Sequence, residues 1–166
     1  MRGGEDSTEN VSRRGLRLAA CLLLACAMGA LAAASLIEFC AAGLARRSFV
    51  FYAIDSGEII VEERMLRRGE TQELDIARYV EEALLGPSSP DSLPLFPRGT
   101  ALRSLLYRGG VVFADMSEDA AMPPLEGGEV LGSFATLRAG IKRNFPSVGE
   151  VRFFIGGRAA FAGEFR

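Results

Sequence analysis

The sequence contains no histidine and no tryptophan, and Lys142 is its only lysine. Histidine is the commonest general base and metal ligand of proteins, so its absence removes most catalytic and metal-binding arrangements. The three cysteines, Cys21, Cys26 and Cys40, all lie in the N-terminal quarter. Residues 48–166 therefore hold no disulfide framework, no cysteine nucleophile and no cysteine-based zinc site. We predict no metal and no cofactor, and a thiol-free segment suits an oxidising compartment.

A concentrated positive charge is also lacking. The net charge is −2 over 166 residues. Proteins that bind nucleic acid usually carry a strongly basic face, so this composition argues against a nucleic-acid partner. The length allows one domain of ordinary size together with a tail or an anchor.

One long apolar run, residues 18–37, carries no charge. A helix of this length measures about 30 Å, which is enough to cross the hydrocarbon core of a bilayer. More arginines precede the run than follow it, so the positive-inside rule places the N-terminus in the cytoplasm. The sequence thus predicts a disordered cytoplasmic tail (1–17), a single-pass anchor in the cytoplasmic membrane (18–44, core 18–37) and an extracytoplasmic, periplasmic domain (48–166).

Two forms of processing are alternatives to the uncleaved anchor. The alanine run at 32–34 could be a signal-peptidase site, which would release the domain from the membrane. Cys21 and Cys26 each follow a leucine and small apolar residues, as the modified cysteine of a lipoprotein does. The apolar stretch that precedes either cysteine contains few residues, however. The identity of the anchor stays open at this point.

The first half of the predicted domain is a hairpin followed by a helix. Aromatic and β-branched residues at 47–52 and 58–65 flank a turn at 55–57, which predicts two paired strands. Thr71 is a plausible helix N-cap, and Gly86 and Pro87 supply a stop. Between them, apolar residues recur at helical spacing on one stripe: Ile76, Tyr79, Val80, Ala83 and Leu84.

The second half repeats the alternation of strands and helices. Prolines exclude regular structure at 88–98, where Leu93, Leu95 and Phe96 are expected to fix the loop to the core. Strands are predicted at 100–107, 111–116, 151–155 and 159–165, and a helix at 129–144. The order ββαββαββ indicates an α+β fold in which two helices cover one face of a single antiparallel or mixed sheet.

Short motifs in the last half of the chain resemble the GerMN domain of bacterial sporulation and germination proteins and of other envelope proteins. The resemblance covers about residues 76–166 in a single copy. It is carried by Leu84-Leu85-Gly86-Pro87, Leu95-Phe96-Pro97, Gly99-Thr100, Gly109-Gly110-Val111-Val112, Asp115-Met116-Ser117 and Phe145-Pro146-Ser147-Val148.

The resemblance implies a fold similar to ring-building motifs and a non-catalytic extracytoplasmic module. It implies that the protein binds or scaffolds envelope components, either peptidoglycan or protein assemblies, with self-association as a further alternative. Some relatives carry two tandem copies, so functions that require both are not carried over to this chain.

A catalytic alternative rests on three acidic residues. Asp115, Glu118 and Asp119 follow one strand closely and could serve a carboxylate-based envelope hydrolase. We favour structural roles for the motif residues instead, in stopping a helix, turning the chain and capping backbone amides. These residues are Gly86, Pro87, Pro97, Gly99, Thr100, Gly109, Gly110, Asp115 and Ser117.

The loop at 88–98 is left without a structural task for its polar residues. We therefore predict an interaction surface on its exposed edge, formed by Ser88, Ser89, Asp91 and Arg98. The predicted partners are the membrane, through a single span, and an envelope component.

Overall fold

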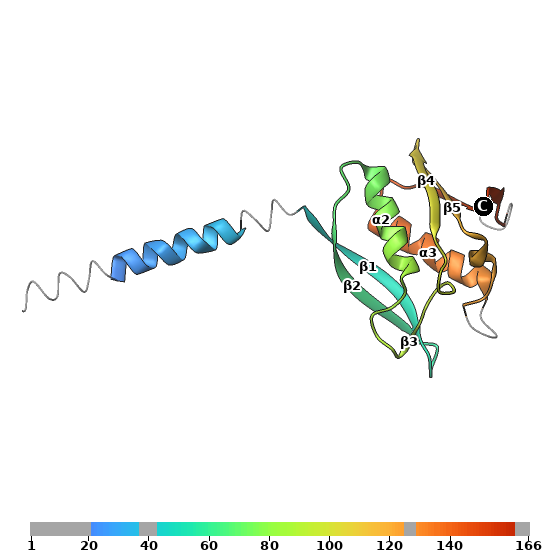
Figure 1. The fold of residues 1–166 in the computed structure, drawn as a ribbon, viewed down its shortest axis with the longest axis horizontal. Helices are drawn as coiled ribbons and strands as arrows, with labels where there is room; N and C mark the ends of the chain where they lie inside the picture. Colours follow the sequence, from blue (N-terminus) through green and yellow to red (C-terminus); the bar gives the residue numbers. More distant parts are fainter. Residues whose placement is uncertain (1–20, 37–42, 125–128, 162–166) are drawn as a thin grey trace, which may run out of the picture. The chain divides into compact units, whose positions relative to one another are not determined.

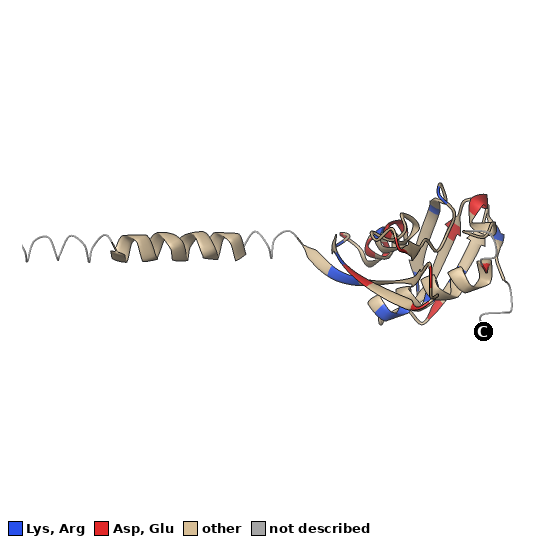
Figure 2. Ribbon diagram, turned by 90° about the horizontal axis from the view of Figure 1, so that it is seen from below, with Lys and Arg blue, Asp and Glu red and all other residues tan. Residues whose placement is uncertain are grey.

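The computed structural model describes residues 21–36, 43–124 and 129–161, which divide between two units, Met1–Gly43 and Leu44–Arg166. In the first unit residues 21–36 form a helix without charged residues (Figure 2). The large apolar side chains of this helix are exposed. Within the described ranges, no helix combines the length and hydropathy needed to span a bilayer. The tail (1–17) and both ends of the expected span lie outside these ranges, so the span stays a prediction.

The second unit begins with the predicted hairpin. β1 (Leu44–Ala53) pairs antiparallel with β2 (Ile59–Arg67) in an unbroken register from Leu44 opposite Arg67 to Tyr52 opposite Ile59 (Figure 1). The inward positions of β1 include Phe49 and Phe51, which are fully buried. Both strands extend beyond the predicted ranges, because backbone pairing continues where the apolar pattern has ended.

Helix α2 (Gln72–Leu84) has the expected ends. The Thr71 side chain accepts a hydrogen bond from Leu74 N at 3.3 Å, and Gly86 follows with φ +87°, a conformation that glycine adopts without steric cost. The predicted apolar stripe is buried from Ile76 to Ala83, and Leu84 is half-buried.

The proline-containing loop is only partly irregular. Ser92 and Leu93 form a two-residue strand, β3, which pairs antiparallel with the end of β1. The prediction that the prolines exclude all regular structure here was wrong, because Ser92 and Leu93 lie between Pro90 and Pro94 and keep the backbone N–H groups that a ladder needs. Leu95 and Phe96 are buried as expected, whereas Leu93 is half-buried.

The remaining elements follow the predicted order. β4 (Leu102–Arg108) and β5 (Val111–Met116) form a hairpin, and the turn residues Gly109 and Gly110 both have positive φ, +59° and +79°. A 3₁₀ turn, η1 (Glu118–Ala121), precedes α3 (Val130–Asn144). β6 (Glu150–Ile155) runs parallel to β5, and the last strand, β7, is only Arg158–Ala159. The end of the predicted final strand, 162–165, lies outside the described residues.

The strands form two sheets, so the prediction of a single sheet with both helices on one face was wrong. One sheet has the order β2-β1-β3 and the other β4-β5-β6-β7. Helix α2 contacts β2 and β4, and α3 contacts β1 and β6, so each helix contacts both sheets (Figure 1). The two sheets are therefore joined by one helical core. The α+β class was predicted correctly.

Phe134 of α3 lies at the centre of that core. Its ring contacts Phe96 of the loop, Phe153 of β6 and Phe161, at centroid distances of 5.0, 4.9 and 5.2 Å. Phe96, Phe134 and Phe153 are each at most 2% exposed. The loop after α2 is thus anchored in the same core as the helices and the four-stranded sheet.

Candidate interaction site

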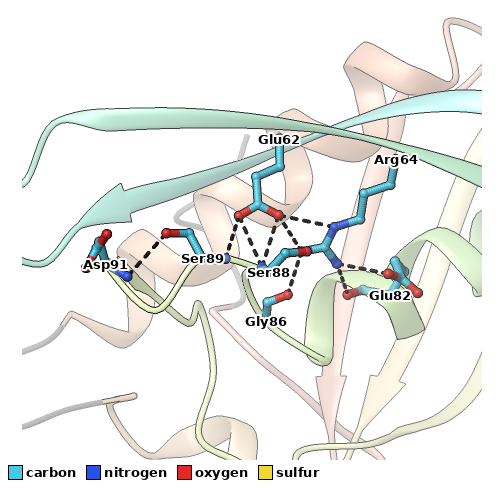
Figure 3. A network of polar contacts seen from close by, with 7 residues as sticks. All are labelled: Glu62, Arg64, Glu82, Gly86, Ser88, Ser89 and Asp91. Atoms are coloured by element: carbon cyan, nitrogen blue, oxygen red, sulfur yellow. Dashed lines mark hydrogen bonds and ion pairs between the residues drawn. The ribbon is translucent and has the colours of Figure 1, made fainter.

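The loop after α2 begins against the side chain of Glu62 on β2. The backbone N–H of Ser88 donates to both Glu62 carboxylate oxygens at 3.1 Å, and that of Ser89 donates at 3.4 Å (Figure 3). Glu62 occupies an inward position of its strand, opposite Phe49, so it faces the loop rather than solvent. One carboxylate thus holds two consecutive amides of the predicted interaction loop.

Arg64 joins this carboxylate to the end of α2. Its guanidinium contacts Glu62 Oε2 at 2.6 Å, Glu82 Oε1 at 2.9 Å and the Gly86 carbonyl oxygen at 2.8 Å (Figure 3). The Arg64 and Glu62 side chains are only 14% and 15% exposed. Since buried charges require such pairing, the network fixes the position of the helix end relative to β2.

The electrostatics of Glu62 reflect the same contacts. Burial works to raise the pKa of the Glu62 carboxyl, but hydrogen bonds from Arg64, Ser88 and Ser89 and the charge of Arg64 outweigh burial. The pKa of Glu62 is therefore lowered below its ordinary value of 4.5. The contacts that hold the loop thus favour the ionised form of this carboxyl.

The middle of the loop is held from the opposite side. The Asp91 carbonyl oxygen accepts from Ile54 N at 2.9 Å, and Asp91 N donates to Ser89 Oγ at 3.3 Å (Figure 3). Further on, Thr100 donates from its amide and its hydroxyl group to the Pro97 carbonyl oxygen. The loop is therefore fixed at both ends and in its centre.

The four predicted interaction residues do not form one cluster. Ser88, Ser89 and Asp91 lie together at the β2 end of the loop, where Ser88 and Asp91 are exposed and Ser89 is half-buried. Arg98 is also exposed but follows the buried Leu95–Phe96 pair. Within the part of the chain that the structure describes, no hydrogen bond or ion pair joins Arg98 to the other three.

Sequence reasoning missed Glu62 and Arg64, which hold the loop. A signal was present: both residues have the same parity along β2 as Ile60 and Leu66, so the strand pattern places two charges on its inner face. Charges at inward strand positions require partners, and the helix end and loop supply them.

The motif residues after β5 make contacts to different neighbours. Asp115 Oδ1 accepts from Gly157 N at 2.9 Å. Ser117 Oγ accepts from Ala101 N and contacts Asp119 Oδ2, each at 3.1 Å. Asp115 and Glu118 both lie beside the β6–β7 turn: Asp115 bonds Gly157 N, and a Cβ atom at Gly156 would be 3.3 Å from Glu118 Oε1. Asp119 instead contacts Ser117, and Glu118 is exposed, so the three acidic residues of the hydrolase alternative do not gather around one point. Across the described ranges, no three acidic or cysteine side chains form a group suited to a metal ion.

Two open pockets lie away from the loop edge. The first, of about 330 Å³, includes Arg47, whose guanidinium contacts Asp75 at 2.5 Å and lies 4.2 Å from the Phe145 ring centroid. The second, of about 280 Å³, lies between β2 and α2. It is lined by Leu66, Arg67, Arg78, Glu81, Glu82 and Leu85.

Two solved structures with a similar fold are GerMN domains. The tandem GerMN domains of the sporulation protein GerM from Bacillus subtilis match with a TM-score of 0.52 and 18% identity over 70% of this chain and 40% of that one. The first GerMN domain of the same protein matches with a TM-score of 0.51 and 15% identity, over 70% of this chain and 86% of that one. A putative lipoprotein from Clostridium perfringens matches with a TM-score of 0.47 and 18% identity, over 70% of this chain and 77% of that one. This chain thus spans less than half of the tandem protein.

Sequence comparison points to the same family. Curated protein sequences gave no significant match. The family model Germane, described as "Sporulation and spore germination", matches residues 50–160, which extends upstream of the motifs into β1 and β2. With a family model that covers most of the chain and a fold shared with GerMN domains, this protein belongs to the Germane (GerMN) family.

Proposed function

We propose that this protein is a non-catalytic, membrane-anchored Germane-family domain that lies outside the cytoplasmic membrane and binds an envelope component. The proposed contact surface is the exposed edge of the loop at 88–98, formed by Ser88, Asp91 and Arg98 with Ser89 beside them. The observation that carries this proposal is the Glu62–Arg64 network, which holds a polar, solvent-facing loop in one conformation.

A loop held in this way is suited to binding. Ordering a flexible loop on association costs free energy, so a surface that is already fixed binds more tightly for the same contacts. Polar residues on a loop positioned by a rigid scaffold are a common arrangement for recognition. The buried Leu95–Phe96 pair and the Glu62 carboxylate supply that scaffold here.

The absence of a catalytic role is supported by the chemistry of the side chains. The sequence has no histidine, and the carboxylates after β5 accept hydrogen bonds from separate donors. A general acid and base would need to reach one reacting group. Hydrolysis of peptidoglycan by the purified chain, lost on Asp115→Asn, would overturn this part of the proposal.

Membrane attachment is supported by the uncharged helix at 21–36 and the arginines that precede it. Alkaline phosphatase fused after Arg166 should be active if the domain is extracytoplasmic, whereas activity only of a cytoplasmic reporter would contradict that location. Metabolic labelling with palmitate, compared between the wild type and the Cys21→Ala and Cys26→Ala variants, distinguishes a lipoprotein from an uncleaved span.

Binding is tested with variants at the loop edge. The full chain is incubated with purified peptidoglycan sacculi and sedimented, and in parallel it is crosslinked in native membranes. Asp91→Arg should abolish capture in whichever assay detects a ligand. Glu70→Arg is the matched control: it makes the same change in charge at an exposed residue that precedes α2, whereas the loop follows the other end of this helix, which is about 20 Å long. Equal loss in both variants, or unchanged capture by Asp91→Arg, would contradict the assigned surface.

A further inference from the structure

β2 is an edge strand whose outer side has no strand partner. It is the terminal strand of the order β2-β1-β3 and is paired only with β1 over its nine residues. Exposed strand edges of this length can pair with another strand, and many proteins shield them for that reason. The outer edge of β2 is therefore open to pairing with a further strand.

The backbone groups that face this edge are those of the odd-numbered residues. Ala53 N donates to the Glu58 carbonyl oxygen at 2.8 Å, so the backbone of Glu58 faces β1. Backbone direction alternates along an antiparallel strand, so the N–H and C=O groups from Ile59 to Arg67 at every second residue face outward. In the described residues, only one hydrogen bond to these groups occurs, from Arg78 Nη1 to the Arg67 carbonyl oxygen at 3.1 Å.

Neither face of the sheet covers the edge. On the inner side the pocket of about 280 Å³ between β2 and α2 leaves space beside Leu66 and Arg67. On the outer side Ile59, Val61 and Met65 are 66%, 47% and 48% exposed. A second strand can therefore approach the edge of β2, where the Arg67 carbonyl oxygen already accepts from Arg78 and can accept a second hydrogen bond.

The sequence of β2 is complementary to itself in one antiparallel register. Figure 2 shows basic and acidic residues along the β1–β2 hairpin. When two copies of β2 pair about a two-fold axis through Met65, Glu63 of each copy lies opposite Arg67 of the other, and the two Met65 side chains meet at the centre. No other two-fold register along β2 places Glu63 opposite Arg67. A register centred on Glu63 places two carboxylates together, which is unfavourable.

We propose that β2 is the contact strand of a homodimer, in which two copies pair antiparallel about Met65 and join their three-stranded sheets into one. The occupant of the edge is a second copy because the opposed charges on the same face match in both directions, as a two-fold interface requires. In this register residues 63–67 of the two strands lie opposite each other, and the outward N–H and C=O groups of Glu63, Met65 and Arg67 supply the ladder. Cross-strand pairs of opposite charge stabilise such pairing. This contact is separate from the loop edge assigned above.

Single-cysteine variants of the full chain test the register. Cys21, Cys26 and Cys40 are replaced by alanine, which leaves no other thiol. Met65→Cys should then form covalent dimers on mild oxidation or with a short bismaleimide. Ile59→Cys is the control on the same strand and face. It is more exposed than Met65, but in this register the two copies of residue 59 are about 40 Å apart, so it should give none.

Charge reversal tests the pairing itself, with association measured by analytical ultracentrifugation of the purified full chain in detergent. Glu63→Arg and Arg67→Glu should each weaken dimerisation by more than about tenfold, since each places like charges opposite one another. An equimolar mixture of the two variants should restore it as a heterodimer. Arg158→Glu is the control, because it makes the same change in charge at an exposed residue of β7, in the other sheet.

Three outcomes would overturn the proposal. The first is a wild-type chain that stays monomeric. The second is crosslinking of Ile59→Cys as strong as that of Met65→Cys. The third is a failure of the two charge variants to associate when mixed although each is folded by circular dichroism. If β2 instead pairs with a strand of a different protein, the purified wild-type chain would stay monomeric, and Met65→Cys would form a crosslink to that other protein.

Discussion

Gly140 of α3 lies directly against the hydroxyl group of Tyr79 on α2: a Cβ atom at position 140 would be 2.3 Å from Tyr79 Oη. Tyr79 has no room to withdraw. It is 2% exposed, its ring stacks on Phe49 at a centroid distance of 4.6 Å, and its hydroxyl donates to the Ser48 carbonyl oxygen at 3.2 Å. The glycine therefore permits the two helices to approach β1 at one point.

Replacing this glycine should destabilise the fold. In an exposed helix, Gly→Ala stabilises by about 1 kcal/mol, but forcing an atom into a packed core costs about 1–3 kcal/mol. We expect Gly140→Ala to lower the free energy of unfolding by up to about 2 kcal/mol, measured by urea denaturation.

Gly132→Ala in the same helix is the matched control. A Cβ atom there would lie 3.7 Å from the Glu129 Cβ atom, an ordinary contact. The variant should be more stable than the wild type by up to about 1 kcal/mol. If both alanine variants were stabilised equally, the close approach at Gly140 would have no energetic consequence.

Tyr79 should ionise well above the ordinary pKa of a tyrosine. Burial raises the pKa of the Tyr79 phenol to about 12 from an ordinary value of 10.0, against the lowering effects of Asn144, Arg143 and Arg47. Because the folded-state pKa is the higher one, the stability contributed by the neutral phenol is complete below pH 10 and is lost as pH rises through about 12. Spectrophotometric titration should show a late tyrosinate step that is missing in Tyr79→Phe; its persistence there would assign the step to another tyrosine.

The domain should lose stability when the side-chain amide of Asn144 is removed. Its side chain accepts from Ser48 N at 3.0 Å and donates to the Ser48 carbonyl oxygen at 2.8 Å, closing a two-bond contact with the edge of β1. Asn144→Ala leaves the Ser48 amide without this partner, at a cost of about 1–3 kcal/mol.

Asn144→Asp separates the two bonds. It keeps the acceptor but brings a carboxylate to the Ser48 and Gly140 carbonyl oxygens, both of which accept from Asn144 Nδ2. At neutral pH it should destabilise the domain at least as much as alanine, and part of the loss should be recovered in acid. Chemical denaturation at both pH values measures this, and an Asp variant as stable as the wild type would contradict it.

The Glu62 carboxylate should make the stability of the loop depend on acid pH. Its folded-state pKa is lowered below the ordinary value of 4.5, so the unfolded chain binds the proton more readily. The stabilisation is therefore complete above 4.5 and disappears as pH falls through the lower, folded-state pKa. The stability difference between the wild type and Glu62→Gln should shrink over this interval.

Hydrogen exchange localises the Glu62 effect. The amides of Ser88 and Ser89 should exchange faster in Glu62→Gln, because the charged acceptor is lost. Glu58→Gln, an exposed residue at the start of the same strand pair, should leave both amides unchanged and alter stability by less than about 0.5 kcal/mol. Equal exchange in all three proteins would show that Glu62 does not hold the loop.

Much of the fold follows from local patterns in the sequence. Thr71 and Gly86 delimit α2, and Gly109 and Gly110 mark the β4–β5 turn, because caps and tight turns depend on the residues at the position itself. The number of sheets does not follow from such signals. Which strands pair depends on contacts between distant segments, such as Ser92 with Ala53 and β5 with β6, and alternation along a strand is the same for one sheet as for two.

The candidate site shows the same division. The loop itself is visible in the sequence through its prolines, and Leu95 and Phe96 indicate how it is anchored. The residues that hold its polar edge, Glu62 and Arg64, lie more than twenty positions upstream, so only the folded structure brings them to it. The role of Asn144 could not be predicted from the sequence either, because its partner Ser48 is 96 positions away.

The contact between Asn144 and Ser48 has a consequence for the limits of polymerisation. On that side of the three-stranded sheet, an amide side chain already occupies the backbone groups of Ser48, and β3 pairs with β1 only at Tyr52 and Ala53. A cross-β polymer requires that each added unit present two open edges, one to join and one to extend. This sheet has a capped side and an open side, so pairing at β2 ends growth instead of propagating it.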